Sequence, residues 1–554
     1  MGVQYKGLDC LLDINNATYL EYGDQSLLKI SEDSLARFGR ITIYFGVATV
    51  FVSTSKYLFY RLADKRYTLG STEYGFLTSL VFVFTAYFRF IAYQPVPRVL
   101  TTWLSFPFSW GNCLYAMVTS IYLLCVCLIP HFWYRGCFGF GFPPLGDRAG
   151  VMATSLMPFL YLLSGKFNLI SFLTGIGYEK LNWLHQYLGV AVLTLALIHC
   201  IPFIYQPLRE GGILYLRDSF QSIEDYQHGT AAFVLLFLLC CMFKREIRQR
   251  VYEISFHFHW ILGVGFFAAL TFHVYGMLAM QNYMWATLGI WFVQWIVRVF
   301  RYGLVRSRTA HLEVKGHSSF EIIVQNPSGI EWVAGQHCLL RFPGVGPLEN
   351  HPFSIASTEK DEHLKFLIIS RSGFTRRLFN LIGETQQKKR VIVDGPYGGI
   401  SRNPSSFDQI ILVASGNGVT ATIPYLISLA NSATPQLVRF IWIVREIGDV
   451  QWFEEELNRC YEVASERIII DIYVTSETEQ KISDEKLTIK YGKPNIPSIV
   501  SPMRNALLRR NLMVCSGSDS LKREICSLAA EFQTAVFSNL HVEEVCLYTE
   551  TYSI

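Results

Sequence analysis

Four histidines in two apolar segments are the residues best suited to chemistry in this sequence. His185 and His199 stand fourteen residues apart in one segment, and His259 and His273 stand fourteen apart in another. In an α-helix, fourteen residues return a side chain to within about 40° of the same face, about 21 Å further along the axis. Two such helices side by side would present two histidine pairs, one near each face of a bilayer core about 30 Å thick.

A histidine pair of this kind can hold a flat haem from both sides. Two imidazoles fill both axial positions of the iron, which leaves no open position for substrate and suits electron transfer. The alternative is ordinary core histidines, but ionisable side chains inside a membrane span are costly and usually functional. His257, sixteen residues before His273, faces elsewhere and is assigned no ligand role. We predict two haem b groups, held by His185 with His259 and by His199 with His273.

The elements that must position these histidines are membrane-spanning helices, each of about twenty residues. Apolar runs of suitable length occur near 41–60, 110–131, 151–171, 182–204, 230–243, 255–279 and 283–300. We interpret a further run at 76–93 as interfacial; if it spans, the N-terminus changes sides. Basic residues cluster at 244–250 and again after the last span. By the positive-inside rule these loops and the C-terminus are cytosolic, so the two histidine helices run in the same direction.

The C-terminal half has the pattern of two further domains. Short β-rich segments predict a small antiparallel β-barrel over 305–403, with strands at 319–325, 337–342, 364–370 and 391–393. Strands then alternate with helices, which predicts a doubly wound parallel sheet over 404–554, with strands at 409–414, 438–444, 468–475 and 511–514. We interpret 477–508 as a polar insertion, 1–38 as a short polar N-terminal segment and 39–304 as the membrane domain.

The predicted barrel carries a candidate flavin site in two parts. The part expected to face the flavin ring is His351, Pro352, Phe353 and Ser354. The part expected to face the pyrophosphate follows about twenty residues later and comprises Arg371, Gly373, Phe374 and Thr375. The first part supplies a fixed turn and a hydroxyl; a buried turn is the alternative. The second places a glycine and a hydroxyl at a helix start, which can bind phosphate, so together they predict FAD.

The predicted α/β domain carries a candidate nucleotide site. Gly416, Gly418 and Thr420 follow a buried strand and open a helix. Glycine there lets the backbone approach a phosphate, and the N–H groups of the first helical turn can bind it. Arg445 ends the next strand and could neutralise the 2′-phosphate that distinguishes NADPH from NADH. A plain surface arginine is the alternative.

Three residues towards the C-terminus complete the predicted site. Cys515 ends a strand just before Gly517 and a helix start, so its thiol could lie beside the nicotinamide carbon that releases hydride. A buried cysteine is the alternative. Tyr552 is placed to stack on the flavin until nicotinamide displaces it, a hypothesis from position alone. Cys515 and Ser354 are the candidate catalytic residues.

These residues jointly resemble the yeast ferric/cupric-chelate reductases, which are related to the NADPH oxidases. The resemblance covers about 110–554 and is carried by Arg148 to Gly150, 164–186, the histidine pairs, HPFS at 351–354, GPYGG at 395–399, GNGVT at 416–420 and CSGSDSL at 515–521. It implies an α-helical polytopic membrane domain with a cytosolic ferredoxin-NADP reductase-type module, and FAD, NADPH and haem as cofactors. The chain departs from the family in having Ser354 where threonine is common, and SGNG instead of a GGSG-like loop.

The expected function is that of a transmembrane metalloreductase. Electrons would move from cytosolic NADPH through FAD and two haems to Fe(III) or Cu(II) chelates on the far side, in support of iron or copper uptake. The same carriers would also suit an NADPH oxidase that makes superoxide, and a non-catalytic transporter or scaffold is a third alternative. The net charge of +4 is small and scattered, which argues against a nucleic-acid partner. The resemblance favours the plasma membrane, with the vacuolar or endoplasmic reticulum membrane as alternatives; the sequence does not indicate an oligomeric state.

Overall fold

The structure is a computed structural model of the 554-residue chain. It describes residues 4–5, 8–9, 32–67, 76–103, 107–129, 144–242, 252–301, 306–326, 329–382, 387–434, 436–476, 487–538 and 541–550. The chain divides into two compact units. The first comprises Met1–Ser55, Leu114–Thr174 and Tyr178–Trp295, and the second comprises Lys56–Cys113, Gly175–Gly177 and Ile296–Ile554.

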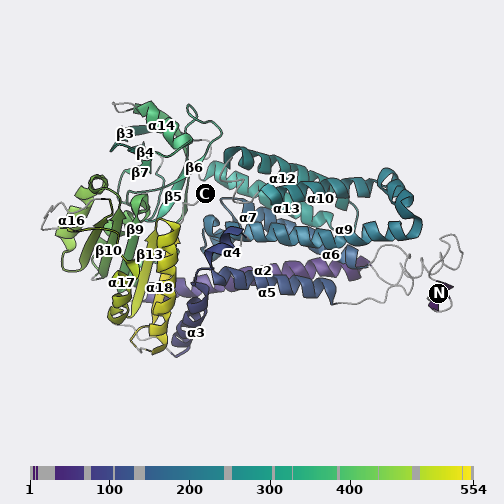
Figure 1. Ribbon diagram of the computed structural model, residues 1–554, viewed down its shortest axis with the longest axis horizontal. Helices are drawn as coiled ribbons and strands as arrows, with labels where there is room; N and C mark the ends of the chain where they lie inside the picture. The colour runs from purple at the N-terminus through teal and green to yellow at the C-terminus, as the bar shows by residue number, and fades with distance from the viewer. Residues whose placement is uncertain are drawn as a thin grey trace. The chain divides into compact units, whose positions relative to one another are not determined.

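Long apolar helices build the first unit (Figure 1). They are α2 (Glu32–Arg66), α5 (Trp110–Leu128), α9 (Tyr178–Ser222), α10 (Glu224–Met242), α12 (Tyr252–Val274) and α13 (Gln281–Phe300). Among the described residues, six helical stretches are long and apolar enough to cross a membrane: Leu35–Arg66, Trp110–Leu128, Tyr178–Tyr205, Glu224–Met242, Ile254–Val274 and Gln281–Phe300. A short antiparallel strand pair, β1 (Gln4–Tyr5) with β2 (Leu8–Asp9), lies in the N-terminal segment.

The apolar run at 151–171 differs from its expected form, because it is not one helix. It is divided among α6 (Pro144–Ser155), α7 (Met157–Ser164) and α8 (Leu169–Thr174). Pro158 sits in the first turn of α7; it has no backbone N–H to donate and its ring collides with a preceding carbonyl, so a continuous helix breaks just before it. Met152 and Met157, on either side of the break, are fully buried, so this segment forms the centre of the bundle.

The second unit contains the predicted antiparallel domain. Its strands are β3 (Ser307–Val314), β4 (Ser319–Gln325), β5 (Gln336–Arg341), β6 (His351–Ser354), β7 (His363–Ile369) and β8 (Gln387–Gly398). They form a six-stranded sheet in the order β6-β5-β8-β3-β4-β7, with antiparallel pairing throughout. Helix α14 (Phe374–Ile382) packs its buried side, which includes Leu378, into the same core.

The second unit also contains the predicted parallel sheet. Its strands are β9 (Gln409–Ser415), β10 (Leu437–Val444), β11 (Ile468–Val474), β12 (Thr488–Tyr491), β13 (Arg510–Ser516) and β14 (Glu544–Glu550). Their order is β12-β11-β10-β9-β13-β14, with parallel pairing throughout. The order reverses at β9, whose neighbours are β10 and β13, and this reversal is the switch point of a doubly wound fold.

Helices cover both faces of the parallel sheet. Helices α15 (Val419–Ala430) and α16 (Glu454–Ala464) share one apolar core with the sheet. Helices α17 (Ile496–Val500) and α18 (Asp519–Ser538) share a second core on the other face. The expected insertion at 477–508 contains β12, α17 and the short helix η4 (Ser501–Ala506) in its described part. It therefore extends the fold, because β12 forms the edge of the sheet.

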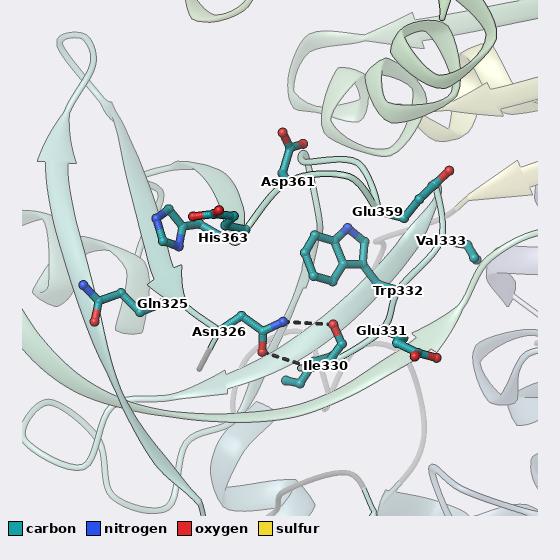
Figure 2. A pocket seen from close by; sticks show the side chains of 10 residues that line it. Gln325, Asn326, Ile330, Glu331, Trp332, Val333, Glu359, Asp361 and His363 are labelled. Atoms are coloured by element: carbon teal, nitrogen blue, oxygen red, sulfur yellow. Dashed lines mark hydrogen bonds between the residues drawn. The ribbon is translucent and has the colours of Figure 1, made fainter. Parts of the chain in front are cut away.

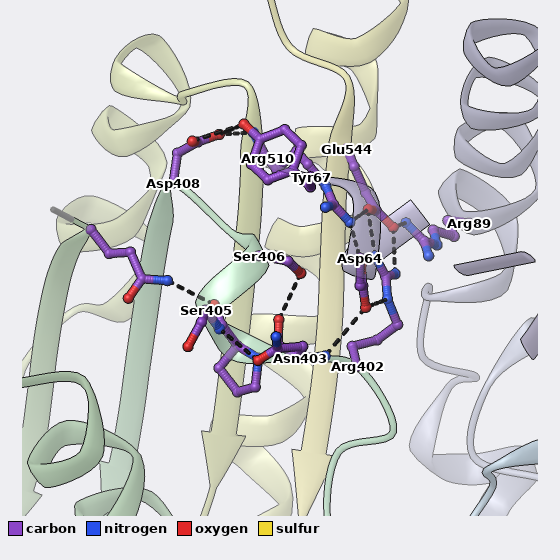
Figure 3. Close-up of polar contacts among 12 residues, drawn as sticks. Asp64, Tyr67, Arg89, Arg402, Asn403, Ser405, Ser406, Asp408, Arg510 and Glu544 are labelled. Atoms are coloured by element: carbon purple, nitrogen blue, oxygen red, sulfur yellow. Dashed lines mark hydrogen bonds and ion pairs between the residues drawn. The ribbon is translucent and has the colours of Figure 1, made fainter. Parts of the chain in front are cut away.

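The end of α2 and helices α3 (Phe76–Ala92) and α4 (Arg98–Trp103) also belong to the second unit. A buried ion network attaches them to the parallel-sheet domain (Figure 3). Its members are two carboxylates and three guanidiniums, and each side chain is at most 9% exposed: Asp64, Arg89, Arg402, Arg510 and Glu544.

The contacts within this ion network are short and shared. Arg402 and Arg510 contact Asp64 at 2.7 and 2.6 Å. The same two arginines contact Glu544 at 2.8 and 3.0 Å, and Arg89 contacts it at 2.9 Å. Burial alone would raise the pKa of Glu544, but the guanidiniums of Arg402 and Arg89 hold it well below its usual range. The carboxylate therefore stays ionised while fully buried.

Candidate functional site

The four histidines lie in two pairs between α9 and α12. The ring centres of His185 and His259 are 6.3 Å apart, and those of His199 and His273 are 6.0 Å apart. In both pairs the ring planes are inclined at 73°. The first histidine of α9 pairs with the first histidine of α12, and the second pairs with the second. The two helices therefore run parallel. In antiparallel helices, the first histidine of one helix would lie beside the second histidine of the other.

Backbone carbonyls orient three of the four rings. His185 Nδ1 lies 3.0 Å from the Leu160 carbonyl oxygen, and His199 Nδ1 lies 2.8 Å from that of Gly146. His273 Nδ1 lies 3.0 Å from the carbonyl oxygen of Asp225. A carbonyl can only accept, so each Nδ1 carries the proton and donates. The lone pair of each ring is then on Nε2, which is the form of imidazole that binds a metal.

The spacing within each pair fits a metal ion between the rings. A bond from a metal to an imidazole nitrogen is about 2 Å long, so two rings on opposite sides of one ion have centres roughly 6 Å apart. The observed 6.0 and 6.3 Å meet that condition. Among the described residues, no group of three or more histidine, cysteine or acidic side chains could hold a metal. A two-histidine set suits an iron whose other four ligands come from a porphyrin, so the residues present fit haem.

Two glycines make room for the second pair. A Cβ atom at Gly150, on α6, would lie 2.8 Å from His199 Nδ1. A Cβ atom at Gly229, on α10, would lie 2.8 Å from His273 Cε1. Sequence reasoning noted Gly150 only as part of a family motif and missed Gly229 and the carbonyl acceptors. Glycine spacing relative to the histidines was a signal for Gly229, whereas the sequence does not mark the carbonyl acceptors. His257 lies beside Phe256 and belongs to neither pair.

Strand β6 presents the first part of the candidate flavin site. His351 stacks on Phe374, with ring centres 4.6 Å apart and planes inclined at 22°. Phe374 is only 2% exposed and belongs to the core of the antiparallel domain, so its ring positions His351. Pro352 and Phe353 are half-buried, and Ser354 is buried opposite His337 on β5.

The second part of this site is the turn that opens α14. The backbone N–H of Arg371 donates to Thr375 Oγ1 at 3.1 Å, and the Thr375 hydroxyl lies 3.4 Å from the Ser372 carbonyl. Gly373 has φ +62°, a conformation that favours glycine. Arg371 and Gly373 are exposed and Thr375 is half-buried, so the start of α14 is accessible to a phosphate.

A buried polar triad in the same domain was not found from the sequence. Arg298, in the last turn of α13, donates to Asp394 Oδ2 at 2.7 Å, and the Tyr397 hydroxyl donates to Asp394 Oδ1 at 2.5 Å. Burial, and then the charge of Asp394, raise the pKa of Tyr397, so the phenol stays protonated. Tyr397 belongs to the GPYGG motif, and its partner Arg298 is 96 residues from Asp394 in the sequence.

A surface hollow of the antiparallel domain lies apart from these residues (Figure 2). Four acidic side chains line it, together with Trp332: Glu331, Glu359, Asp361 and Glu362. None of the predicted site residues is among its lining. An acidic lining disfavours the phosphates of a nucleotide cofactor, so we assign no cofactor to this hollow.

The predicted nucleotide residues converge at one edge of the parallel sheet. Strands β9 and β13 are parallel neighbours, so the loops at Gly416–Gly418 and after Ser516 leave the sheet on the same side. The loops are interlocked: a Cβ atom at Gly418 would collide with the Ser516 carbonyl oxygen, and Ser518 N–H donates to Ser415 Oγ at 3.0 Å. Helices α15 and α18 begin at this edge. Ligands of doubly wound folds bind there, at the switch point.

The remaining predicted residues differ in how accessible they are. Thr420 is buried and its hydroxyl donates to the Asn417 carbonyl at 2.9 Å, so it stabilises the loop. Arg445 is exposed just after β10. Cys515 is 1% exposed on β13, and burial raises the pKa of its thiol, which stays protonated. Gly517 follows at the loop, where a Cβ atom would collide with Ser415. Tyr552 lies outside the described residues.

Comparisons with known proteins match all three parts of the chain. Residues 149–270 match the family described as ferric reductase like transmembrane component. Residues 304–401 match an FAD-binding domain, and 407–499 match a ferric reductase NAD binding domain. The chain is 30% identical to ferric/cupric reductase transmembrane component 7 of Saccharomyces cerevisiae, over 99% of this chain and 98% of that protein.

Two further similarities cover less of the chain or are weaker. The chain is 27% identical to ferric/cupric reductase transmembrane component 1 of Candida albicans, over 64% of this chain and 48% of that protein. Among solved structures, the flavohemoglobin of Malassezia yamatoensis matches with a TM-score of 0.38 and 12% identity, over 73% of this chain and 96% of that chain.

Proposed function

Because this chain belongs to the ferric/cupric reductase family, we propose that it carries electrons across its membrane to Fe(III) or Cu(II) chelates through two bis-histidine haem sites. The chain is a multi-pass transmembrane metal reductase with FAD and NAD(P) binding domains. The observation that carries the proposal is the pair of matched imidazole sets, 6.3 and 6.0 Å between ring centres, on two parallel apolar helices. Fourteen residues of helix separate the sets by about 21 Å along the axis.

The histidines act by fixed orientation. Each ring with a carbonyl partner keeps its proton on Nδ1 and its lone pair on Nε2, so the two rings of a pair would hold a haem between them. When bound, FAD accepts a hydride from NADPH and haem iron carries one electron at a time, which converts a two-electron donor to one-electron acceptors. Because each pair would hold its haem between two imidazoles, the acceptor would meet the protein at its surface, outside the sites of His185 and His199.

In the second unit, the chain's own groups bind and orient. The exposed start of α14 with Arg371 is suited to the FAD pyrophosphate, and Ser354 to the flavin ring. The interlocked loops at Gly418 and Gly517 are suited to the NADPH phosphates, with Arg445 at the 2′-phosphate. Cys515, protonated and buried, shapes the nicotinamide side of the site. In this proposal Ser354 and Cys515 position the reacting rings.

The membrane and orientation are part of the proposal. The basic clusters at 244–250 and after the last span support a cytosolic C-terminal half, with the pair His185 and His259 nearer to the cytosol. The pair His199 and His273 then faces the metal chelate. The plasma membrane is the membrane where such a reductase would support uptake of iron or copper.

Haem stoichiometry in the purified full-length protein tests the proposal. We expect two low-spin haems per chain in the unaltered protein and a loss of haem in His199→Ala and in His259→Ala. His257→Ala is the matched control, because His257 is on α12 but belongs to neither pair, and it should keep both haems. A protein without a low-spin haem spectrum, or one whose His199→Ala variant keeps both haems, would contradict the proposal.

A further inference from the structure

Helix α3 is a 17-residue apolar helix with the sequence FLTSLVFVFTAYFRFIA. Arg89 is its only charged residue. At 1.5 Å per residue it is about 26 Å long, which is less than the hydrocarbon core of a bilayer. The parallel-sheet domain holds one face of α3, and the other face is available to a different partner.

The bound face of α3 is a narrow stripe. Phe82, Ala86 and Arg89 are its buried residues among those whose side chains are described, and they recur at positions i, i+4 and i+7 of one helical face. Arg89 contacts Glu544 of β14 at 2.9 Å, and Ala86 belongs to the apolar core beneath α18. This stripe fixes α3 to the parallel-sheet domain.

Contacts on either side of the stripe reinforce the attachment. Tyr87 stacks on Phe537 of α18, with ring centres 4.0 Å apart, and the Tyr93 hydroxyl accepts from the Leu547 N–H at 3.3 Å. Further on, Arg523 of α18 donates to the Val96 carbonyl at 2.5 Å. The segment from α3 to Val96 therefore has a fixed orientation on this domain.

The rest of α3 is exposed and apolar. Eight large apolar side chains are exposed on it. One of them, Tyr87, stacks on Phe537, and we call the other seven the apolar face of α3: Leu80, Val81, Val83, Phe84, Phe88, Phe90 and Ile91. Phe84 is 72% exposed. The described residues of 306–550 also contain eight exposed large apolar side chains, from Val314 to Leu508, but these are scattered singly over the whole range. A concentrated apolar surface of this kind marks an interaction site.

We propose that the apolar face of α3 lies in the headgroup–acyl boundary of an anionic bilayer and holds the parallel-sheet domain at the membrane surface. In the chain, α3 lies between α2 and α5, and both contain stretches able to cross a membrane. A segment between two consecutive spans begins and ends at the same membrane surface. The lipid at that surface is therefore always within reach of α3.

Charge supports lipid as the occupant. The one cation of α3, Arg89, is turned away from the apolar face and is neutralised by Glu544, so no exposed charge has to enter the acyl region. The preceding turns of α2 carry exposed Arg61, Lys65 and Arg66, which suit anionic headgroups. An apolar face beside a basic rim is the arrangement of an interfacial helix.

Lipid photolabelling of the full-length protein tests this proposal. The protein is placed in nanodiscs of phosphatidylcholine and phosphatidylserine that contain a phosphatidylcholine with a diazirine on its acyl chain, and adducts are mapped by mass spectrometry. We expect adducts on α3 at the positions of Leu80, Phe84 and Phe88, and none at Phe82 or Ala86. Labelling of α12 and α13 without labelling of α3 would overturn the proposal.

Matched variants sharpen the test. Phe84→Glu combined with Phe88→Glu should reduce labelling of α3 about tenfold. The double variant loses the favourable transfer of two phenylalanine side chains from water into lipid. NADPH-driven reduction of a soluble dye should be unchanged and shows that the domains are folded. Val463→Glu is the control, because Val463 is 58% exposed on α16, away from α3 in the sequence, and it should leave labelling unchanged. Equal loss of labelling in both variants, or no loss in either, would contradict a lipid contact at α3.

Discussion

The histidine pairs of the first unit and the ion network of the second bury polar groups in opposite ways. Each histidine with a carbonyl partner uses one ring nitrogen to bind the backbone, and we propose that the other binds a haem iron. In the ion network, Asp64 and Glu544 are surrounded by three guanidiniums of the same chain. In our proposal the first set holds a cofactor, whereas the second set neutralises its own charges and stabilises the fold. Substitutions in the two places should therefore have different consequences.

The largest effect is expected from removing a ligand. His185→Ala should reduce NADPH-driven reduction of ferric chelate more than about a hundredfold, since loss even of an outer-shell partner of a metal ligand costs ten- to a hundredfold. Dye reduction by the second unit should stay within about twofold. Steady-state assays with both acceptors measure the two rates. A parallel loss of both would mean that His185 serves folding, and the comparison would fail.

Breaking the ion network should give the reverse pattern. Glu544→Gln leaves buried guanidiniums without their partner, and such a change costs about 3–5 kcal/mol of folding free energy. Thermal unfolding followed by flavin fluorescence should show a lower transition temperature with normal haem content. Glu543→Gln is the control, because Glu543 is the neighbouring residue and its pair with Arg509 is partly exposed. A similar small shift in both variants would contradict a stabilising role for the ion network.

The same carboxylate predicts a pH dependence of stability. Its folded pKa is held well below the usual range, so its contribution is present above the unfolded value of about 4.3 and is lost as pH falls towards the folded value. The difference in unfolding temperature between the unaltered protein and Glu544→Gln should therefore be constant above about pH 5 and shrink in more acidic buffer. A difference that grew on acidification would contradict this assignment of charge.

A smaller effect is expected where a glycine gives space to a ligand. Gly150→Ala would place a methyl group 2.8 Å from His199 Nδ1, and overpacking of this kind costs about 1–3 kcal/mol. We expect a shifted midpoint potential or partial loss of one haem, measured by redox titration of the visible spectrum. Gly289→Ala on α13 is the control, because α13 carries none of the four histidines and nothing lies within 4 Å of the Gly289 Cβ position. Identical titrations for both variants would show that the close contact is unimportant.

The smallest effect is expected at Arg445, an exposed side chain that we propose binds the 2′-phosphate of NADPH. Arg445→Ala should raise the KM for NADPH about tenfold through loss of charge-assisted hydrogen bonds, and should leave the KM for NADH unchanged. Arg439→Ala is the control. Arg439 is on β10, the strand that Arg445 follows, but it already contacts Asp471 at 2.9 Å. Dye reduction with each nucleotide measures both constants. An equal rise for NADPH and NADH would place Arg445 away from the 2′-phosphate.

Local periodicity explains how much of the fold could be predicted. Helix geometry alone predicts that His185 and His199, fourteen residues apart, lie on nearly the same face of a helix. The strands around Ile322 and Leu412 are predicted by their content of β-branched residues. The family, the two-domain C-terminal module and the reductase function are confirmed by the fold and the comparisons. The roles of single site residues stay predictions.

Features that depend on distant or backbone contacts could not be predicted. The carbonyl of Asp225 binds a histidine 48 residues away, and any residue type offers such an acceptor. Arg89 and Glu544 are 455 residues apart, so neither reveals its partner in the sequence. Strand β3 alternates buried and exposed residues but contains charged and polar side chains that hide its strand pattern. Pro158 was a visible signal, and the helix break beside it follows from its chemistry.

The most direct test of transmembrane electron transfer uses sealed vesicles that contain the full-length protein. Ferric chelate is trapped inside with an Fe(II)-specific dye, and NADPH, which does not cross the bilayer, is added outside. Chains whose second unit faces outward should produce Fe(II) inside the vesicles, and His199→Ala should abolish that signal while NADPH still reduces an external dye. NADPH oxidation by the unaltered protein with no Fe(II) inside would contradict an electron path through the two histidine pairs.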